Sequence, residues 1–171
     1  MLTEENHMKL GIIGSRNLTV DNLEDYIPEG VTEIISGGAK GVDACAQKYA
    51  EEHGIKMTVF KPNYEKFGRA APIYRNVDIV AHSDKVIAFW DGESRGTLSG
   101  LKMCRQMKIP HEIYIYILGK YHQIEPDVED LFLGKLTKLE GAAAETLYLK
   151  LTEDDSLLKE IDSLLKETDK K

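Results

Sequence analysis

Five short apolar runs, separated by stretches with the periodicity of amphipathic helices, are the feature that most limits the folds open to this chain. The runs cover residues 8–13, 34–35, 56–60, 85–90 and 111–117, and the predicted helices cover 19–27, 42–53, 72–81 and 97–107. Strands that alternate with helices in this way form a mainly parallel sheet with helices packed against it. We therefore predict an α/β domain with a mainly parallel five-stranded sheet.

Two residues indicate where the predicted helices end or begin. Gly54 follows the helix predicted over 42–53, and glycine commonly ends a helix in the left-handed conformation. Pro72 begins the next helix, because a proline in the first turn removes an N–H that has no partner inside the helix.

Glycine-rich loops follow the first, second and fourth predicted strands. Gly14-Ser15-Arg16 follows the first, the segment 36–43 follows the second, and the segment 91–97 follows the fourth. Such loops expose backbone N–H groups beside a helix N-terminus, where an anion is stabilised. Ligands of parallel α/β sheets bind beyond the carboxyl ends of the strands. We therefore expect the three loops to form one site for a phosphorylated small molecule, most simply a nucleotide.

The candidate ligand-binding residues come from these loops and from the start of the helix that Pro72 opens. They are Gly14, Ser15, Arg16, Ser36, Gly37, Gly38, Ala39, Lys40, Gly41, Asp43, Arg75, Asn76, Asp91, Ser94, Arg95, Gly96 and Thr97.

A purely structural interpretation exists for each loop. The segment 36–43 matches neither the P-loop, since Lys40 precedes Gly41, nor the dinucleotide-binding glycine fingerprint. Glycines alone are explained by tight turns between strand and helix. Asp43 could simply complement a helix dipole, and Thr97 could cap its helix or bind phosphate. Both interpretations stay open from the residues alone.

The charge of the chain narrows the classes of partner. With 22 basic and 29 acidic residues the net charge is −7, which disfavours duplex DNA and anionic membrane surfaces. Arg16, Lys40, Arg75 and Arg95 nevertheless lie in or near the candidate loops. Local cations in an acidic protein are what a site for a small anion requires, although ordinary surface residues give the same pattern.

Aromatic residues near the loops allow two interpretations. Trp90 ends the fourth predicted strand, and Tyr64 and Phe67 lie in the irregular segment before Pro72. Each ring could stack on a nucleotide base. Packing in the core for Trp90, and within the loop for Tyr64 and Phe67, explains them equally well.

The sequence offers no metal-ligand or redox motif. Cys45 and Cys104 both fall in predicted helices, and the five histidines are scattered. We expect buried thiols in a reducing compartment, no metal and no resident cofactor. Because the first residues lack the pattern of a signal peptide and no run approaches a membrane span, we expect a cytoplasmic protein.

The order of these motifs resembles the SLOG superfamily, named for the Smf/DprA and LOG proteins. The motifs are Gly14-Ser15-Arg16, then Ser36-Gly37-Gly38-Ala39-x-Gly41-x-Asp43, then Gly68-x-Ala70-Ala71-Pro72-Ile73-x-Arg75-Asn76, and finally Ala88-Phe89-Trp90-Asp91-Gly92-x-Ser94-Arg95-Gly96-Thr97. They are most similar to the YspA-like, YpsA-related branch. The resemblance implies a Rossmann-like three-layer α/β/α fold and a pocket for a nucleotide-derived ligand of the ADP-ribose or NAD-derivative type, with sensing as one role.

The resemblance also brings two alternative functions. LOG-type enzymes release a free base from a nucleoside monophosphate, and their Gly-Thr pair is followed shortly by a catalytic glutamate. Here Leu98-Ser99-Gly100-Leu101 follows Gly96-Thr97, so the glutamate is missing. A nucleotide hydrolase would then depend on Arg75, Asp43 or Asp91. The DprA branch binds single-stranded DNA, but this acidic chain lacks a basic and aromatic track.

The chain divides into two predicted regions. Residues 8–117 correspond to the SLOG-like domain, and residues 118–171 form a C-terminal extension. Alternating residues over 147–151 indicate a strand, and leucines and an isoleucine share one face of a helix predicted over 153–167. An apolar stripe of this kind packs on its own domain, on a second copy of the chain or on a partner. We predict a homodimer.

Overall fold

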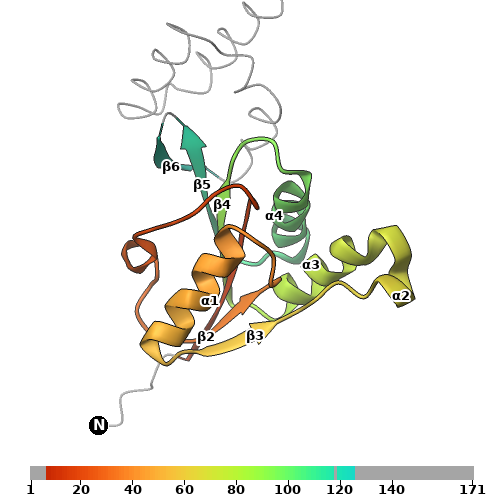
Figure 1. The fold of residues 1–171 in the computed structure, drawn as a ribbon, viewed down its shortest axis with the longest axis horizontal. Coiled ribbons are helices and arrows are strands. Elements are labelled where there is room, and N and C mark those ends of the chain that lie inside the picture. Colours follow the sequence, from red (N-terminus) through yellow and green to blue (C-terminus); the bar gives the residue numbers. More distant parts are fainter. Residues whose placement is uncertain (1–6, 118, 126–171) are drawn as a thin grey trace, which may run out of the picture.

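The computed structural model describes residues 7–117 and 119–125, which fold around a six-stranded sheet (Figure 1). The strands are β1 (Met8–Gly14), β2 (Val31–Ser36), β3 (Lys56–Val59), β4 (Lys85–Trp90), β5 (His111–Ile117) and β6 (Lys120–Ile124). Their order is β3-β2-β1-β4-β5-β6. The first five strands are parallel, and β6 runs antiparallel to β5. The predicted Rossmann-like fold is confirmed, with one strand more than expected.

Four α-helices connect the strands. They are α1 (Val42–His53), α2 (Tyr64–Phe67), α3 (Ala71–Ala81) and α4 (Arg95–Met107). Single 3₁₀ turns occur at Leu23–Asp25 (η1) and Gly68–Ala70 (η2). In Figure 1, α1 lies on one face of the sheet, and α3 and α4 lie together on the other. The three layers follow from the right-handed crossovers that join parallel strands.

The central strands separate two hydrophobic cores. Along β4, Ile87 and Phe89 pack with α1, whereas Val86, Ala88 and Trp90 pack with α3 and α4. Successive side chains of a strand point to opposite faces, so a continuous apolar run is what a strand covered on both faces needs. Trp90 is fully buried in the second core, and its ring is therefore a core element.

Three predicted elements have the predicted ends. Helix α1 and strands β4 and β5 match residue for residue. Gly54 ends α1 with φ 65°, and its N–H donates to the carbonyl of Ala50. Pro72 lies in the first turn of α3. These ends depend on neighbouring residues in the sequence, which is why the pattern alone predicted them.

The prediction of a helix over residues 19–27 is wrong. Only the 3₁₀ turn η1 forms there, and the segment instead crosses the α1 face of the sheet with Leu18, Val20 and Leu23 buried. Those positions do not share one face of a helix. Tyr26 packs edge-on against Phe89, with 5.0 Å between ring centroids. Tertiary burial, not helical periodicity, determines this segment.

Strand β6 lies where the sequence analysis placed the C-terminal extension. Its residues, Lys-Tyr-His-Gln-Ile, are mostly polar, because an edge strand has only one neighbour and is partly open to water. The strand predicted over 147–151, the helix predicted over 153–167 and the dimer contact inferred from it lie outside the described residues.

The described residues contain no helix long and apolar enough to cross a membrane. Across the same ranges, no group of three or more histidine, cysteine, aspartate or glutamate residues could hold a metal ion. Cys104 is buried, and burial raises the pKa of its thiol to about 12. Cys45 is half-buried, and its sulfur accepts a hydrogen bond from the N–H of Val20.

One polar contact between β2 and β3 leads to a test of stability. The hydroxyl of Thr58 donates to the carboxylate of Glu33, and Lys56 Nζ lies 3.6 Å from the same carboxylate. The Thr58 hydrogen bond and then Lys56 hold the pKa of Glu33 below its ordinary value, against the effect of burial. A lowered pKa stabilises the fold above the ordinary value of 4.5 and loses that contribution as the pH falls through the lowered pKa.

We therefore expect Thr58→Val to lower the free energy of unfolding at pH 7 by about 1 kcal/mol. Urea denaturation at pH 7 and at pH 3 measures the effect. The difference from the wild type should narrow toward the lower pH, because the stabilisation by ionised Glu33 is lost as the pH falls through its lowered pKa. Thr58→Ser keeps the hydroxyl and is the matched control. A difference that stays constant with pH would contradict the role given to this carboxylate.

Candidate functional site

A cavity of about 400 Å³ lies at the carboxyl ends of β1 and β4. The strand order reverses here, because β1 leads to β2 on one side and β4 lies on the other. Parallel α/β sheets bind ligands at this switch point. The volume falls in the range of small-molecule sites.

The cavity brings together most of the residues that the sequence analysis selected. Eleven of them line it: Gly14, Arg16, Gly37, Ala39, Asp43, Arg75, Asn76, Asp91, Ser94, Gly96 and Thr97. A second, more open hollow of about 650 Å³ adjoins it and includes Gly38 and Lys40. Ser15, Ser36, Gly41 and Arg95 line neither space. We call the two spaces the inner cavity and the outer hollow.

The loop between β2 and α1 passes very close to the loop after β1. Gly41 has φ 72°, and a β-carbon there would meet the main-chain oxygens of Arg16 and Ser15. Asp43, in the first turn of α1, turns back toward this loop, and its Oδ2 accepts from the N–H of Ala39 at 3.1 Å. The glycine and the aspartate together fix the loop as one wall of the inner cavity.

Arg75 and Asn76 of α3 connect that wall to the opposite one. Arg75 Nη1 donates to the carbonyl of Gly37 at 2.9 Å, and its Nε donates to Asn76 Oδ1 at 3.2 Å. Asn76 Nδ2 then donates to the carbonyl of Gly96 at 3.2 Å. A continuous chain of hydrogen bonds, the Arg75–Asn76 bridge, thus runs from the β2–α1 loop to the N-terminus of α4.

The loop between β4 and α4 is held by its own polar residues. Asp91 Oδ1 accepts from the N–H groups of Glu93 and Ser94, at 2.9 and 2.7 Å. Ser94 is the N-cap, and its Oγ accepts from the N–H of Thr97. The Thr97 hydroxyl donates to that same Oγ at 3.1 Å. Ser94, and not Thr97, therefore caps the helix.

Two of the predicted serines hold the loops together. Ser15 and Ser36 are buried. Ser15 Oγ accepts from the N–H of Asp91 at 3.1 Å, and Ser36 Oγ accepts from the N–H of Gly38 at 3.4 Å. Ser15 thereby links the loops after β1 and β4.

The carboxyl group of Asp43 is an unusual member of this wall because it is only 6% exposed. Burial raises its pKa, against the lowering effects of the Ala39 N–H and the Arg75 guanidinium. Burial also lowers the pKa of Arg75, against the effect of Asp43. An arginine remains charged in proteins, so the inner cavity presents a cation beside a carboxyl group that is costly to ionise.

Some lining residues were missed by the sequence analysis. Asn17 lines the inner cavity, and Lys61 and Pro62 line the outer hollow beside Tyr64. The missed residues directly follow an element already assigned: Asn17 continues the loop after β1, and Lys61 follows β3 closely. Extending each strand-end loop by a few residues would have found them.

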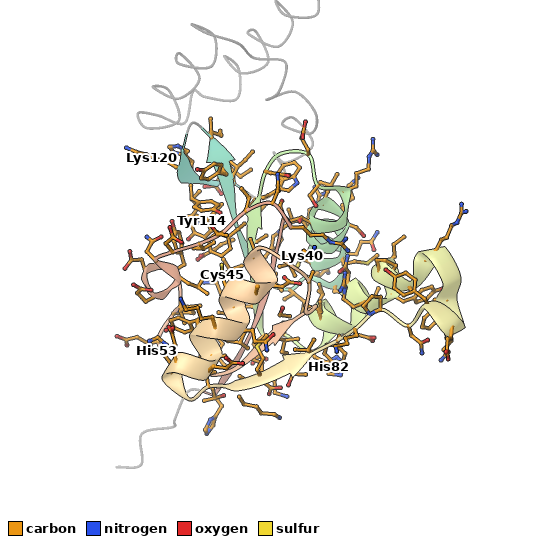
Figure 2. The ribbon with its side chains drawn as sticks, in the orientation of Figure 1. Lys40, Cys45, His53, His82, Tyr114 and Lys120 are labelled. Carbon is orange, nitrogen blue, oxygen red and sulfur yellow. The ribbon has the colours of Figure 1, made fainter. Side chains whose placement is uncertain are left out.

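The arrangement has the groups that bind an anionic ligand. It supplies guanidinium and amide donors, a helix N-terminus, and carboxyl oxygens that accept hydrogen bonds from hydroxyl groups. Lys40 belongs to the loop before α1. In the view of Figure 2, it lies between α1 and the two helices α3 and α4. Phosphate and ribose are groups that such donors and acceptors recognise.

Comparison with known proteins supports the resemblance drawn from the sequence. Residues 16–67 match the model of the YspA, cpYpsA-related SLOG family. The match covers Arg16, β2, the whole β2–α1 loop, α1 and β3, and ends before Arg75. No curated protein and no solved structure matched the chain.

Proposed function

We propose that this chain binds a nucleotide or nucleotide-derived ligand of the ADP-ribose or NAD-derivative type in the inner cavity, in a sensing role. One reason is that the chain is related through residues 16–67 to the YspA-like branch of the SLOG superfamily. The observation that carries the proposal is the Arg75–Asn76 bridge, which joins two glycine loops across a cavity at the switch point of the sheet.

The charges and donors of the cavity favour this class of ligand. Arg16 and Arg75 provide guanidinium groups, and α4 presents its N-terminus at Gly96 and Thr97. Both features stabilise a phosphate. Asp43 and Asp91 offer carboxyl oxygens in the same cavity, and such oxygens accept hydrogen bonds from ribose hydroxyls.

The sequence of α4 disfavours LOG-type cleavage as the activity. Ser99 and Gly100 stand where the catalytic glutamate of LOG enzymes would be expected after Gly96-Thr97. A β-carbon at Gly100 would lie 2.7 Å from Cδ1 of Ile13, which is the end of a flexible side chain. The missing carboxylate is therefore the observation that disfavours cleavage. Binding without cleavage is accordingly the function we favour over hydrolysis.

Gly96→Ala should separate binding from folding. Nothing lies within 4 Å of a β-carbon built at Gly96, and the residue lines the inner cavity within the first turn of α4. Alanine favours a helix by up to about 1 kcal/mol over glycine, so the melting temperature should stay constant or rise. The added methyl group takes space that a ligand at the helix N-terminus needs. We expect binding to weaken by about tenfold or more.

Isothermal titration calorimetry of the purified, ligand-stripped protein with AMP, ADP-ribose, NAD and cyclic ADP-ribose measures this effect. At least one of the four should release or absorb heat with the wild type. The absence of binding to all four, or unchanged affinity in Gly96→Ala, would contradict a nucleotide at this end of α4. Chromatography of the same mixtures for free base or phosphate distinguishes binding from hydrolysis.

A further inference from the structure

The outer hollow differs from the inner cavity in its charge. Four cationic side chains line it, those of Arg16, Lys40, Lys61 and Arg75, and no acidic residue does. The inner cavity, in contrast, has two arginines and two aspartates. The outer hollow is thus locally positive, although the chain as a whole has a net charge of −7. A locally positive hollow attracts anions.

The cations of the outer hollow come from separate parts of the fold. Lys40 lies on the loop after β2, Lys61 follows β3, Arg16 follows β1, and Arg75 belongs to α3. Within residues 7–117 and 119–125, neither lysine forms a hydrogen bond or an ion pair with a protein group. An anionic ligand would supply the counter-charge that the protein does not give these two ammonium groups.

The two spaces also share a wall. Arg16, Gly37, Ala39 and Arg75 line both, so one ligand can extend from the inner cavity past Arg75 into the outer hollow. Pro62 and Tyr64 also line the outer hollow, and Tyr64 is 57% exposed. A ligand group that fits the outer hollow carries negative charge that the two lysines can bind.

We infer that the outer hollow is a second anion subsite, and that the ligand is of the nucleoside diphosphate class, with Lys40 and Lys61 binding the phosphate farther from the nucleoside. The inference rests on the proposed function, because the nucleoside end must lie in the inner cavity. According to this inference, a nucleoside monophosphate fills only the inner cavity and leaves the outer hollow empty.

Calorimetry with AMP and ADP at physiological salt tests the inference. In the wild type, ADP should bind about tenfold or more tightly than AMP, because charge-assisted contacts are added for the second phosphate. In the double variant Lys40→Ala/Lys61→Ala this advantage of ADP over AMP should fall to less than about twofold. The control is Lys48→Ala/Lys66→Ala, which removes the same charge from exposed positions outside both spaces and should preserve the ADP advantage.

The outcomes distinguish the two proposals. Equal affinities for AMP and ADP in the wild type overturn the second subsite and leave the nucleotide site intact. An ADP advantage that survives in Lys40→Ala/Lys61→Ala, or that is lost equally in the control, also overturns it. If neither AMP nor ADP binds at all, the proposed function and the inference that rests on it both fall for these nucleotides.

Discussion

Arg75→Ala is expected to weaken nucleotide binding by about a hundredfold or more, which corresponds to about 2.7 kcal/mol. The guanidinium is shared by both spaces of the site, so its loss removes a cation from each. It also leaves the Gly37 carbonyl without its donor and breaks the first link of the Arg75–Asn76 bridge. We expect the free energy of unfolding to fall by about 1–3 kcal/mol as well.

Titration calorimetry and urea denaturation of the same preparations separate these two effects. Arg75→Lys keeps the positive charge but not the two-pronged donor geometry, so its affinity should lie between those of the wild type and Arg75→Ala. Arg69→Ala is the matched control, because Arg69 is an exposed arginine of η2 that lines neither space. Wild-type affinity in Arg75→Ala would remove this residue from the site.

Gly41→Ala is expected to be the most destabilising single methyl addition among the loops of the site, at about 3 kcal/mol or more. Two costs add. The residue has φ 72°, which L side chains rarely adopt. The new β-carbon would also meet two main-chain oxygens, of Ser15 and Arg16, that belong to the neighbouring loop. Main-chain atoms of a packed loop cannot move aside as the end of a flexible side chain does.

Gly54→Ala isolates the first of these costs. Gly54 has φ 65° but nothing lies within 4 Å of its β-carbon, so only the backbone preference is lost, at about 1 kcal/mol. Urea denaturation of the two variants side by side gives the difference. Similar losses in both would show that the close approach of the two loops contributes little to stability.

Local signals explain what could be predicted from the sequence. The helix over 42–53 has a glycine at its end, and the runs 85–90 and 111–117 are bounded by turn residues, so their limits follow from neighbours in the chain. Each glycine loop follows a strand, and parallel strands end at one edge. The gathering of Gly14, Gly37 and Gly96 around one cavity was therefore predictable in outline.

Contacts between segments that are distant in sequence explain which features could not be predicted. The hydrogen bonds of Arg75 to Gly37 and of Asn76 to Gly96 join residues far apart in sequence, and no periodicity records them. The segment 19–27 was misassigned because its burial depends on Phe89 and Tyr114, which reach it only in the folded sheet. The ligand-binding roles of Ser15 and Ser36 stay predictions, whereas their hydrogen bonds to the backbone are visible only in three dimensions.

The strand order determines the stage of folding at which the inner cavity forms. Neighbours β1 and β4 are separated along the chain by β2, β3 and three helices, and pairing between distant segments is the slow part of folding. A chain still being synthesised has no inner cavity until β4 and the start of α4 have emerged and docked beside β1. Nucleotide binding would then report the pairing of β4 with β1, and a ligand present during refolding would stabilise only molecules that have made this pairing.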